Sequence, residues 1–437
     1  PFDPQRKRVS KIVRKGFLRE LIVLGAPDEL IKLIKQQPSA TQELTKWITE
    51  QGKIGKRVLL VTTKTLATPP ISIEKAENGM IFLGAISFID PIKPTTFAAI
   101  SQARALGVKI KILTGDSKEV SGNVALQIGL IKNEHEVITG DEFKELSPAQ
   151  QLAVVDKFSV FARVTPQLKY KIVKLLEQKQ AVGFLGEGIN DAPALKVANV
   201  ALVVAHASDI AKEAADIVLL KRSLHVVIEG IREGRNVFVN TTKYITATLA
   251  ANFGNFFAVS IASLLIEYLP MLPLQILLVN LLSDFPMIAI ATDHVDTGSS
   301  YQPSRFNFRQ FALTALILGA VSTLFDFVFF GIFVHSPAPV LQTAWFMGSI
   351  MTELLFIFSV RTRLLFFRAS RPSITLMILT FVAFVITLLL PYITISQQIF
   401  AFQPLTFKEL STVITIVCSY FITTEIVKLF YYKFVKQ

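Results

Sequence analysis

Apolar and polar positions divide the chain into two halves of different character. Residues 1–245 mix charged positions with short apolar runs, whereas residues 246–434 hold long apolar runs with few charges. Helices of about 20 apolar residues cross the roughly 30 Å hydrocarbon layer of a membrane. Runs of about this length lie at 246–268, 271–292, 311–334, 342–360, 374–393 and 410–431. The second half is therefore predicted to be an all-α transmembrane domain with six spans.

In the first half, short apolar runs alternate with amphipathic segments. The apolar runs are Ile81–Phe88, Val108–Leu113, Phe158–Phe161, Ala181–Leu185, Val200–Val204 and Ile217–Leu220. A helix-like stretch at 94–106 lies between the first two of them. This alternation favours a doubly wound parallel sheet, in which ligands bind at the carboxyl ends of the strands. We therefore predict an α/β domain at 76–221, part of a separate lobe at 1–75, and a helix at 222–245 leading into the first span.

The composition agrees with a membrane protein and argues against other classes. Hydrophobic residues make up 51% of the 437 positions and charged residues 18%, which is too apolar for an ordinary soluble protein. Lys and Arg exceed Asp and Glu by 12 (45 against 33). Much of this basic surplus flanks the apolar spans, where basic residues set the orientation of a protein in the membrane, so membrane orientation explains the surplus better than nucleic-acid binding does. The single cysteine, Cys418, excludes a disulfide framework and a thiol metal site.

The connecting loops predict an orientation in the membrane. The loop 361–371 carries four arginines and the loop 294–309 carries Arg305 and Arg309, whereas 335–339 and 394–407 contain no Lys or Arg. Positively charged loops stay on the cytoplasmic side. We therefore expect a multi-pass protein of the cytoplasmic membrane, with residues 1–245 and the carboxyl terminus inside the cell.

Two predicted strands end in loops that carry candidate chemistry. Thr114-Gly115-Asp116 follows one strand, and Gly186-Glu-Gly-Ile-Asn-Asp191 follows another. A hydroxyl and free N–H groups at a strand end form an anion site, and Glu187 with Asp191 offers the carboxylate oxygens that Mg²⁺ prefers. Lys169, on a helix predicted to begin with proline, is suited to neutralise a phosphoryl group in transfer. Each feature alone also fits a turn, a helix cap or a solvated lysine, but their order points to one site.

The motifs resemble those of P-type cation-transporting ATPases, in their carboxy-terminal part. The phosphorylation-domain motifs are matched by Thr114–Asp116, by Ala162-Arg163 with Pro166 and Lys169, and by Gly186–Pro193. Asp90-Pro91 with Lys93-Pro94 resembles the hinge of that domain, and Gly25-Ala-Pro27 and Arg57 resemble nucleotide-domain motifs. The resemblance implies a haloacid-dehalogenase-like domain that uses ATP and Mg²⁺. It makes 1–75 a partial nucleotide-binding domain, 76–221 the phosphorylation domain and 222–245 a stalk helix.

The resemblance also implies roles for individual residues. The implied catalytic residues are Thr114, Gly115, Asp116, Lys169, Asn190 and Asp191; those implied for cofactor binding are Arg57, Gly25, Gly186 and Gly188; those for the metal are Glu187 and Asp191.

In the membrane half, the resemblance is strongest to bacterial magnesium-importing pumps, with the calcium-pumping branch as the alternative. It rests on Ala251–Asn255, Val279-Asn280 with Asp284, Asp293–Asp296, Gln342–Phe346 and Arg361–Arg363. It implies that the transported cation meets Asn252, Asn255, Asn280 and Asp284. Asp284 is independently notable, because a carboxylate inside an apolar span is costly without a partner. Asn252 and Asn255 equally fit hydrogen bonding between helices, and structural or interfacial placement fits Asp326, Glu353 and Glu425 better.

Three features depart from the family pattern. The family phosphorylates the aspartate of an Asp-Lys-Thr-Gly-Thr segment, which does not occur in this sequence; Asp296-Thr-Gly298 is a superficial echo that follows a span. Glu187 stands where the family usually has Asp, and a misplacement of about 1 Å in such a site can cost about 100-fold in rate. Leu24 stands where the family usually has Lys.

We therefore expect the carboxy-terminal portion of an ATP-driven divalent-cation pump, with Mg²⁺ as the first candidate cargo. For autophosphorylation it would need an upstream portion, as part of the same chain or as a separate polypeptide. Two other hypotheses stay open at this point. One is a catalytically inactive membrane fragment of such a pump, and the other is a membrane-tethered phosphatase, which would also need a nucleophilic aspartate.

Overall fold

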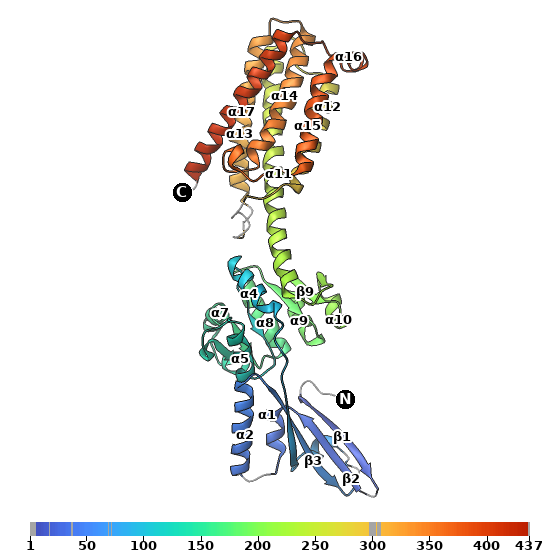
Figure 1. Ribbon diagram of the computed structural model, residues 1–437, viewed down its shortest axis with the longest axis vertical. Coiled ribbons are helices and arrows are strands. Elements are labelled where there is room, and N and C mark those ends of the chain that lie inside the picture. The colour runs from blue at the N-terminus through green and yellow to red at the C-terminus, as the bar shows by residue number, and fades with distance from the viewer. Residues whose placement is uncertain are drawn as a thin grey trace. The chain divides into compact units, whose positions relative to one another are not determined.

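A computed structural model describes residues 6–16, 18–35, 38–68, 70, 72–296, 303 and 307–435. The chain forms two compact units, Pro1–Ile228 and Glu229–Gln437, and the boundary between them lies inside the helix α11 (Leu224–Leu265). Within the described residues, the first unit combines helices and strands and the second contains helices alone (Figure 1). The predicted α/β domain followed by an all-α region is therefore confirmed.

The first unit opens with a four-stranded antiparallel sheet. Its strands, in spatial order, are β1 (Arg8–Lys15), β2 (Leu18–Gly25), β3 (Arg57–Leu66) and β4 (Ile81–Phe88). Their buried residues pack against three helices: α1 (Pro27–Leu30), α2 (Pro38–Lys53) and α3 (Ile73–Ala76). The assignment of Ile81–Phe88 to the parallel sheet was wrong, because Phe82 and Ala85 pack on this apolar core. This sheet thus continues past residue 75, the boundary suggested by the sequence.

The rest of the first unit contains two parallel sheets of three strands each. One has the order β5 (Ile112–Leu113), β7 (Val160–Ala162), β6 (Val137–Thr139), and the other the order β10 (Ile217–Leu219), β9 (Val200–Val204), β8 (Gly183–Gly186). The middle strand β7 is fully buried along its length, as expected for a parallel strand covered on both faces. The parallel arrangement agrees with the prediction, although the strands form two sheets where the sequence suggested one.

Short helices lead into the first of these parallel strands and connect the others. They are α4 (Thr95–Ala105), α5 (Lys118–Gln127), α6 (Gly140–Lys144), α7 (Pro148–Lys157), α8 (Pro166–Glu177), α9 (Ala192–Val197) and α10 (Asp209–Glu213). The start of α8 is determined locally: the Thr165 hydroxyl accepts a hydrogen bond from the N–H of Leu168, and Pro166 occupies the first turn, where its missing N–H costs nothing. This start places Lys169 near the beginning of α8, which begins with proline as the sequence predicted.

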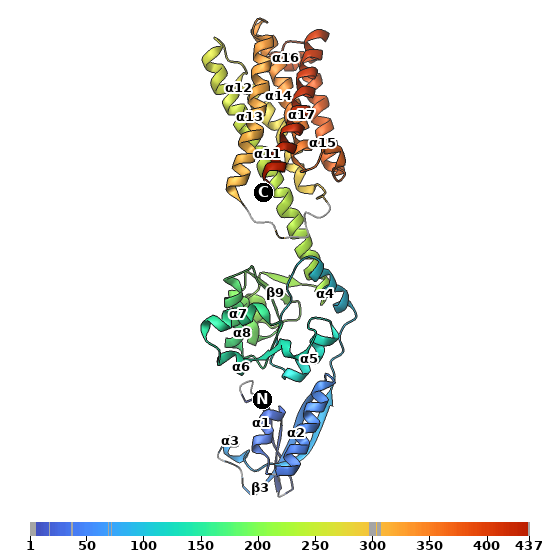
Figure 2. The same ribbon diagram turned by 90° about the vertical axis from the view of Figure 1, so that its left-hand side faces the viewer.

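The second unit is a helical bundle (Figure 2). After α11 come α12 (Pro273–Ile288), α13 (Phe308–Phe333), α14 (Ala338–Val360), α15 (Ile374–Leu389), α16 (Thr394–Phe400) and α17 (Phe407–Val435). Among the described residues, six helices are long and apolar enough to cross a membrane, and they match the six predicted spans. The predicted stalk and first span form a single helix, α11. The most deeply buried helix is α14, which packs against α12, α13, α15 and α17.

Glycines allow close contact between these helices. A Cβ atom on Gly348 of α14 would lie 2.2 Å from the ring of Phe329 on α13, and one on Gly319 would lie 3.0 Å from the carbonyl oxygen of Ala250 on α11. In membranes, where water does not drive helices together, small residues allow the backbone contact that stabilises a bundle. Glycine is therefore required at position 348 by packing.

Gly348→Ala is expected to lower the free energy of unfolding by about 1–3 kcal/mol, because the added methyl group displaces the Phe329 ring. The measurement is thermal unfolding of the purified chain in detergent. Gly331→Ala is the matched control, since a Cβ on this α13 glycine meets nothing within 4 Å. Equal melting temperatures for the two variants would contradict the packing argument.

Candidate functional site

The loops that follow β5 and β7 are bonded to each other. The Thr114 hydroxyl oxygen accepts a hydrogen bond from the N–H of Asp116 (3.1 Å) and lies 3.0 Å from the Asp116 carboxylate. The N–H of Arg163 donates to the carbonyl of Asp116 (2.9 Å), and the N–H of Val164 donates to that of Thr114 (3.0 Å). The Thr-Gly-Asp loop is therefore held against the segment that leads into α8.

Lys169 and Asp191 form the central ion pair of the first unit. The Lys169 Nζ lies 2.8 Å from Asp191 Oδ1, and both side chains are only 16% exposed. Asp191 Oδ2 accepts hydrogen bonds from the N–H groups of Glu187 (3.1 Å) and Gly188 (3.3 Å). Burial acts to raise the pKa of Asp191, but the hydrogen bond and charge of Lys169, with the two N–H groups, outweigh it and hold this pKa below its ordinary value. Asp191 is thus kept ionised near neutral pH.

Two of the predicted site glycines are required by close packing. A Cβ on Gly186 would lie 2.7 Å from the Cβ of Asp191, so glycine lets the acid fold back over the strand end. A Cβ on Gly25 would lie 2.6 Å from the Cβ of Arg8 and from Leu30 Cδ1. Around Gly115 and Gly188 the space is open, with no neighbouring atom closer than 4.0 Å. Packing alone therefore explains why positions 25 and 186 are glycine, independently of any ligand.

The remaining predicted residues make contacts of their own. The Arg57 Nη2, on β3, contacts Asp116 Oδ2 at 2.7 Å. The Glu187 Oε2 contacts Arg222 Nη2 at 2.6 Å, and this hydrogen bond and charge raise the pKa of Arg222. Asn190 is exposed in the short 3-10 turn Ile189–Asp191. Arg222 was missed by the sequence analysis, and it has no motif that would have distinguished it from other surface arginines.

In the second unit, the four predicted ion-path residues separate into two groups. Asn255 Nδ2, on α11, donates a hydrogen bond to Glu353 Oε1 on α14 at 2.7 Å. Asn252, Asn280 and Asp284 lie exposed on α11 and α12. Glu353, which we expected to be structural, is thus the acid that meets a predicted ion-path residue.

The other acids in the spans have structural partners. Asp326 Oδ1 accepts a hydrogen bond from Trp345 Nε1 (2.7 Å), and Glu425 pairs with Lys428. Over the part of the chain that the structure describes, no group of three or more His, Cys, Asp or Glu residues is placed to hold a metal ion.

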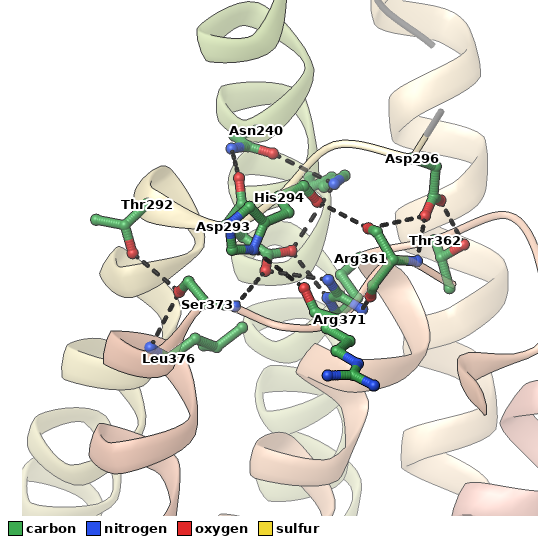
Figure 3. Close-up of polar contacts among 12 residues, drawn as sticks. Asn240, Thr292, Asp293, His294, Asp296, Arg361, Thr362, Arg371, Ser373 and Leu376 are labelled. Atoms are coloured by element: carbon green, nitrogen blue, oxygen red, sulfur yellow. Dashed lines mark hydrogen bonds and ion pairs between the residues drawn. The ribbon is translucent and has the colours of Figure 1, made fainter. Parts of the chain in front are cut away.

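A buried polar junction joins three segments of the second unit (Figure 3). The Asp293 carboxylate accepts hydrogen bonds from Arg361 Nε (2.8 Å) and Nη2 (3.0 Å) and from the N–H of Ser373 (3.0 Å). The Asp293 carbonyl accepts one from Asn240 Nδ2 on α11 (2.6 Å). Arg361 is 2% exposed, so this carboxylate compensates the cost of burying its positive charge.

Asp296 extends the same junction. Its carboxylate accepts hydrogen bonds from the Thr362 hydroxyl (2.7 Å) and the N–H of Ser370 (2.9 Å). Burial acts to raise the pKa of Asp296, but these hydrogen bonds outweigh it and lower the pKa. Asp293–Asp296 and Arg361–Arg363, separate motifs in the sequence, thus meet in space. Thr297 and Gly298 of the Asp-Thr-Gly echo, and Arg305, lie outside the described residues.

Asp293→Ala is expected to cost about 3–5 kcal/mol of stability, because it leaves the buried Arg361 charge without its carboxylate. Glu229→Ala is the control, since it removes an ion pair with Arg232 whose side chains are 43% and 55% exposed, worth about 0–1 kcal/mol. Chemical unfolding of the purified chain in detergent measures both. Similar losses for the two variants would show that the junction does not stabilise the bundle.

Comparison with known proteins agrees with this architecture. Residues 17–199 match the family model of haloacid dehalogenase-like hydrolases, and residues 268–430 match that of the cation transporting ATPase carboxyl terminus. A magnesium-transporting ATPase, P-type 1, of Escherichia coli K12 is 35% identical over 451 residues, which cover 99% of this chain and 50% of the relative. One from Salmonella typhimurium LT2 is 36% identical with the same coverage.

The likeness to calcium pumps is less extensive. A calcium-transporting ATPase of Bacillus subtilis is 33% identical over 310 residues, which cover 67% of this chain and 35% of the relative. The chain spans about half the length of the magnesium-transporting relatives it matches. It belongs to the P-type cation-transporting ATPases, a family of ion-translocating ATPases that use ATP and Mg²⁺, and corresponds to their carboxy-terminal half.

Proposed function

We propose that this chain is the carboxy-terminal half of an ATP-driven pump for divalent cations, with Mg²⁺ as the cargo. The observation that carries the proposal is the Lys169–Asp191 ion pair, at the ends of parallel strands in a chain that also contains six apolar helices. The magnesium-transporting relatives support Mg²⁺ as the cargo, because their similarity extends over 99% of the chain. The similarity to the calcium pump extends over 67%.

The residues of the first unit suit phosphoryl transfer. Thr114 and the N–H groups of its loop would bind phosphoryl oxygens, and Lys169 would neutralise their charge. Mg²⁺ fits the donor set, because Asp191 and Glu187 offer carboxylate oxygens from one loop and Asp191 is held ionised. When bound there, Mg²⁺ would add a positive charge beside the phosphoryl group. Arg57 and the Gly25 segment would contact the nucleotide.

Phosphorylation needs an aspartate that this sequence does not supply in the family motif. We propose that this acid comes from the amino-terminal half of the pump, so that this chain is inactive alone. In the complete pump, the carboxylate attacks the γ-phosphorus of ATP, an aspartyl phosphate forms, and ADP leaves. A catalytically silent fragment is the second candidate function. Two observations favour it: Glu187 is engaged by Arg222, and Leu24 brings no positive charge.

The second unit would carry the ion path on the exposed side of α11 and α12. Exposed polar groups within a span are costly in lipid, so Asn252, Asn280 and Asp284 need other protein or water against them. The amino-terminal half would supply this cover, and the cation would pass along this face. Glu353, through Asn255, would add a carboxylate to the path. The arginine-bearing loops would face the cytoplasm.

The function is tested by phosphorylation with labelled ATP in membranes that carry this chain with and without the amino-terminal half of the Escherichia coli relative. Label is expected on the amino-terminal half only when this chain is present. Asp191→Ala should remove the label, whereas Asp209→Ala, at a fully exposed acid of α10, should leave it unchanged. Label that survives Asp191→Ala would refute the role of Asp191. No label on either chain would support the silent fragment.

Asp284→Asn is expected to raise the Mg²⁺ concentration that gives half-maximal ATP hydrolysis by the joined halves at least about tenfold. This change corresponds to about 1.4 kcal/mol of binding free energy, because a neutral amide replaces a charged ligand. Hydrolysis is measured against Mg²⁺ concentration with ATP saturating. Glu267→Gln serves as the control, since Glu267 is an exposed acid between α11 and α12. An unchanged concentration dependence would rule Asp284 out as a ligand.

A further inference from the structure

Both carboxylates of the loop that follows β8 are paired with positive charges of the chain itself. Asp191 is paired with Lys169 at 2.8 Å. Glu187 is paired with Arg222, whose Nη2 lies 2.6 Å from Glu187 Oε2. Within the chain, two positive charges therefore balance the two negative ones. Since Mg²⁺ needs carboxylate oxygens, it has to compete with one of these two side-chain cations.

The backbone of Glu187 is fixed on both sides. Its N–H donates a hydrogen bond to Asp191 Oδ2 at 3.1 Å. Its carbonyl accepts a hydrogen bond from the N–H of Ser208, also at 3.1 Å. An exchange of partners at Glu187 is therefore a movement of the side chain alone.

The backbone of Arg222 is fixed as well. Its carbonyl accepts a hydrogen bond from Lys93 Nζ at 3.2 Å, and α11 begins two residues later at Leu224. The contact with Glu187 thus depends on the lengths of two side chains that extend from anchored backbone. An aspartate at 187 would be shorter by one C–C bond, about 1.5 Å, and would leave its carboxylate about 4 Å from Arg222 Nη2. The longer glutamate, which stands where the family usually has aspartate, is therefore what brings the carboxylate to Arg222.

The two ion pairs differ in how firmly they are held. The Lys169 and Asp191 side chains are each 16% exposed. Those of Arg222 and Glu187 are 58% and 52% exposed. Separating a buried pair leaves an uncompensated charge away from water, whereas water solvates the partners of an exposed pair once they part. Arg222 is therefore the cation that leaves when a metal ion binds, and Lys169 stays on Asp191.

Arg222 lowers the attraction of Glu187 for a metal ion. A guanidinium has five N–H donors and no acceptor, so it offers Mg²⁺ no ligand and repels it. Its hydrogen bond also occupies a lone pair of the carboxylate that Mg²⁺ would use. Arg222 thus acts on the metal through Glu187, which makes it a positioning residue of the site.

We propose that Arg222 is an internal competitor of Mg²⁺ at Glu187, and that the Glu187–Arg222 pair sets the Mg²⁺ concentration at which the site fills. Mg²⁺ binds when the guanidinium leaves Glu187 for water, and the guanidinium returns when Mg²⁺ leaves. This inference rests on the proposed function, since it takes Glu187 and Asp191 as the acids that bind the metal. It gives the glutamate at position 187 a role that the shorter aspartate could not perform.

The test is binding of Mn²⁺, which takes the same oxygen ligands as Mg²⁺, to the full chain in detergent. The electron paramagnetic resonance signal of free Mn²⁺ measures this binding, and the part that Asp191→Ala removes is assigned to the site. Arg222→Gln is expected to lower the dissociation constant of that part at least about threefold, because the competing cation is gone. An unchanged dissociation constant would overturn the proposal.

Lys221→Gln is the matched control. It removes the same charge from the neighbouring exposed residue and leaves the Glu187–Arg222 pair in place. This variant should bind Mn²⁺ as the unchanged chain does. Equal tightening by Lys221→Gln and Arg222→Gln would show that general positive charge sets the affinity, and competition at Glu187 would be refuted.

A double-mutant cycle tests whether Arg222 acts through Glu187. Glu187→Asp, whose side chain is too short to keep the contact, should by itself bind Mn²⁺ more tightly than the unchanged chain. Adding Arg222→Gln to Glu187→Asp is then expected to change the dissociation constant no further. Weaker binding by Glu187→Asp, or the same effect of Arg222→Gln in both backgrounds, would contradict the proposal.

The labelled-ATP assay separates this inference from the proposed function. Mn²⁺ binding that responds to Arg222→Gln, without label on either half, would support the competition and refute the pump. Label together with Mn²⁺ binding that depends on Asp191 but ignores Arg222 would support the pump and refute the competition. If no variant, Arg222→Gln included, shows Mn²⁺ binding that depends on Asp191, the competition is overturned whatever the label shows.

Discussion

The ion pair between Lys169 and Asp191 is the interaction on which the first unit depends. It joins α8, the helix that follows β7, to the loop that follows β8 in the other parallel sheet, and it keeps Asp191 ionised despite burial. Asp191 in turn holds the N–H groups of Glu187 and Gly188, which shapes the loop that follows β8. Without this pair, α8 and the loop that follows β8 would lose their direct charged link.

The second unit depends on a comparable buried charge. Arg361 and Asp293 join the connection between α14 and α15 to the one between α12 and α13, and Asn240 brings in α11. Apolar contact alone orders helices poorly in lipid, which is as apolar as they are. A directional ion pair at the ends of the helices, together with glycine contacts such as Gly348 against Phe329, therefore sets how these segments meet.

Much of the candidate site follows from local sequence. Pro166 and Thr165 start a helix that presents Lys169, and the run after Leu185 places Asp191 at a strand end. The contacts of Arg222, Arg57 and Glu353 could not be predicted in this way, because their partners lie 35, 59 and 98 residues away in the chain. Such pairings have no local pattern, and exposed arginines are common on any surface.

The sequence by itself determined the division into an α/β half and six apolar helices, because strand and helix periods and span lengths are local properties of the chain. It also indicated the loops in which we propose that the chemistry occurs. Only the tertiary structure decided that β4 joins the first sheet and that the parallel strands form two sheets ending at β5 and β8. Strand pairing depends on which apolar faces can be buried together, and that choice is made by contacts between segments far apart in the chain.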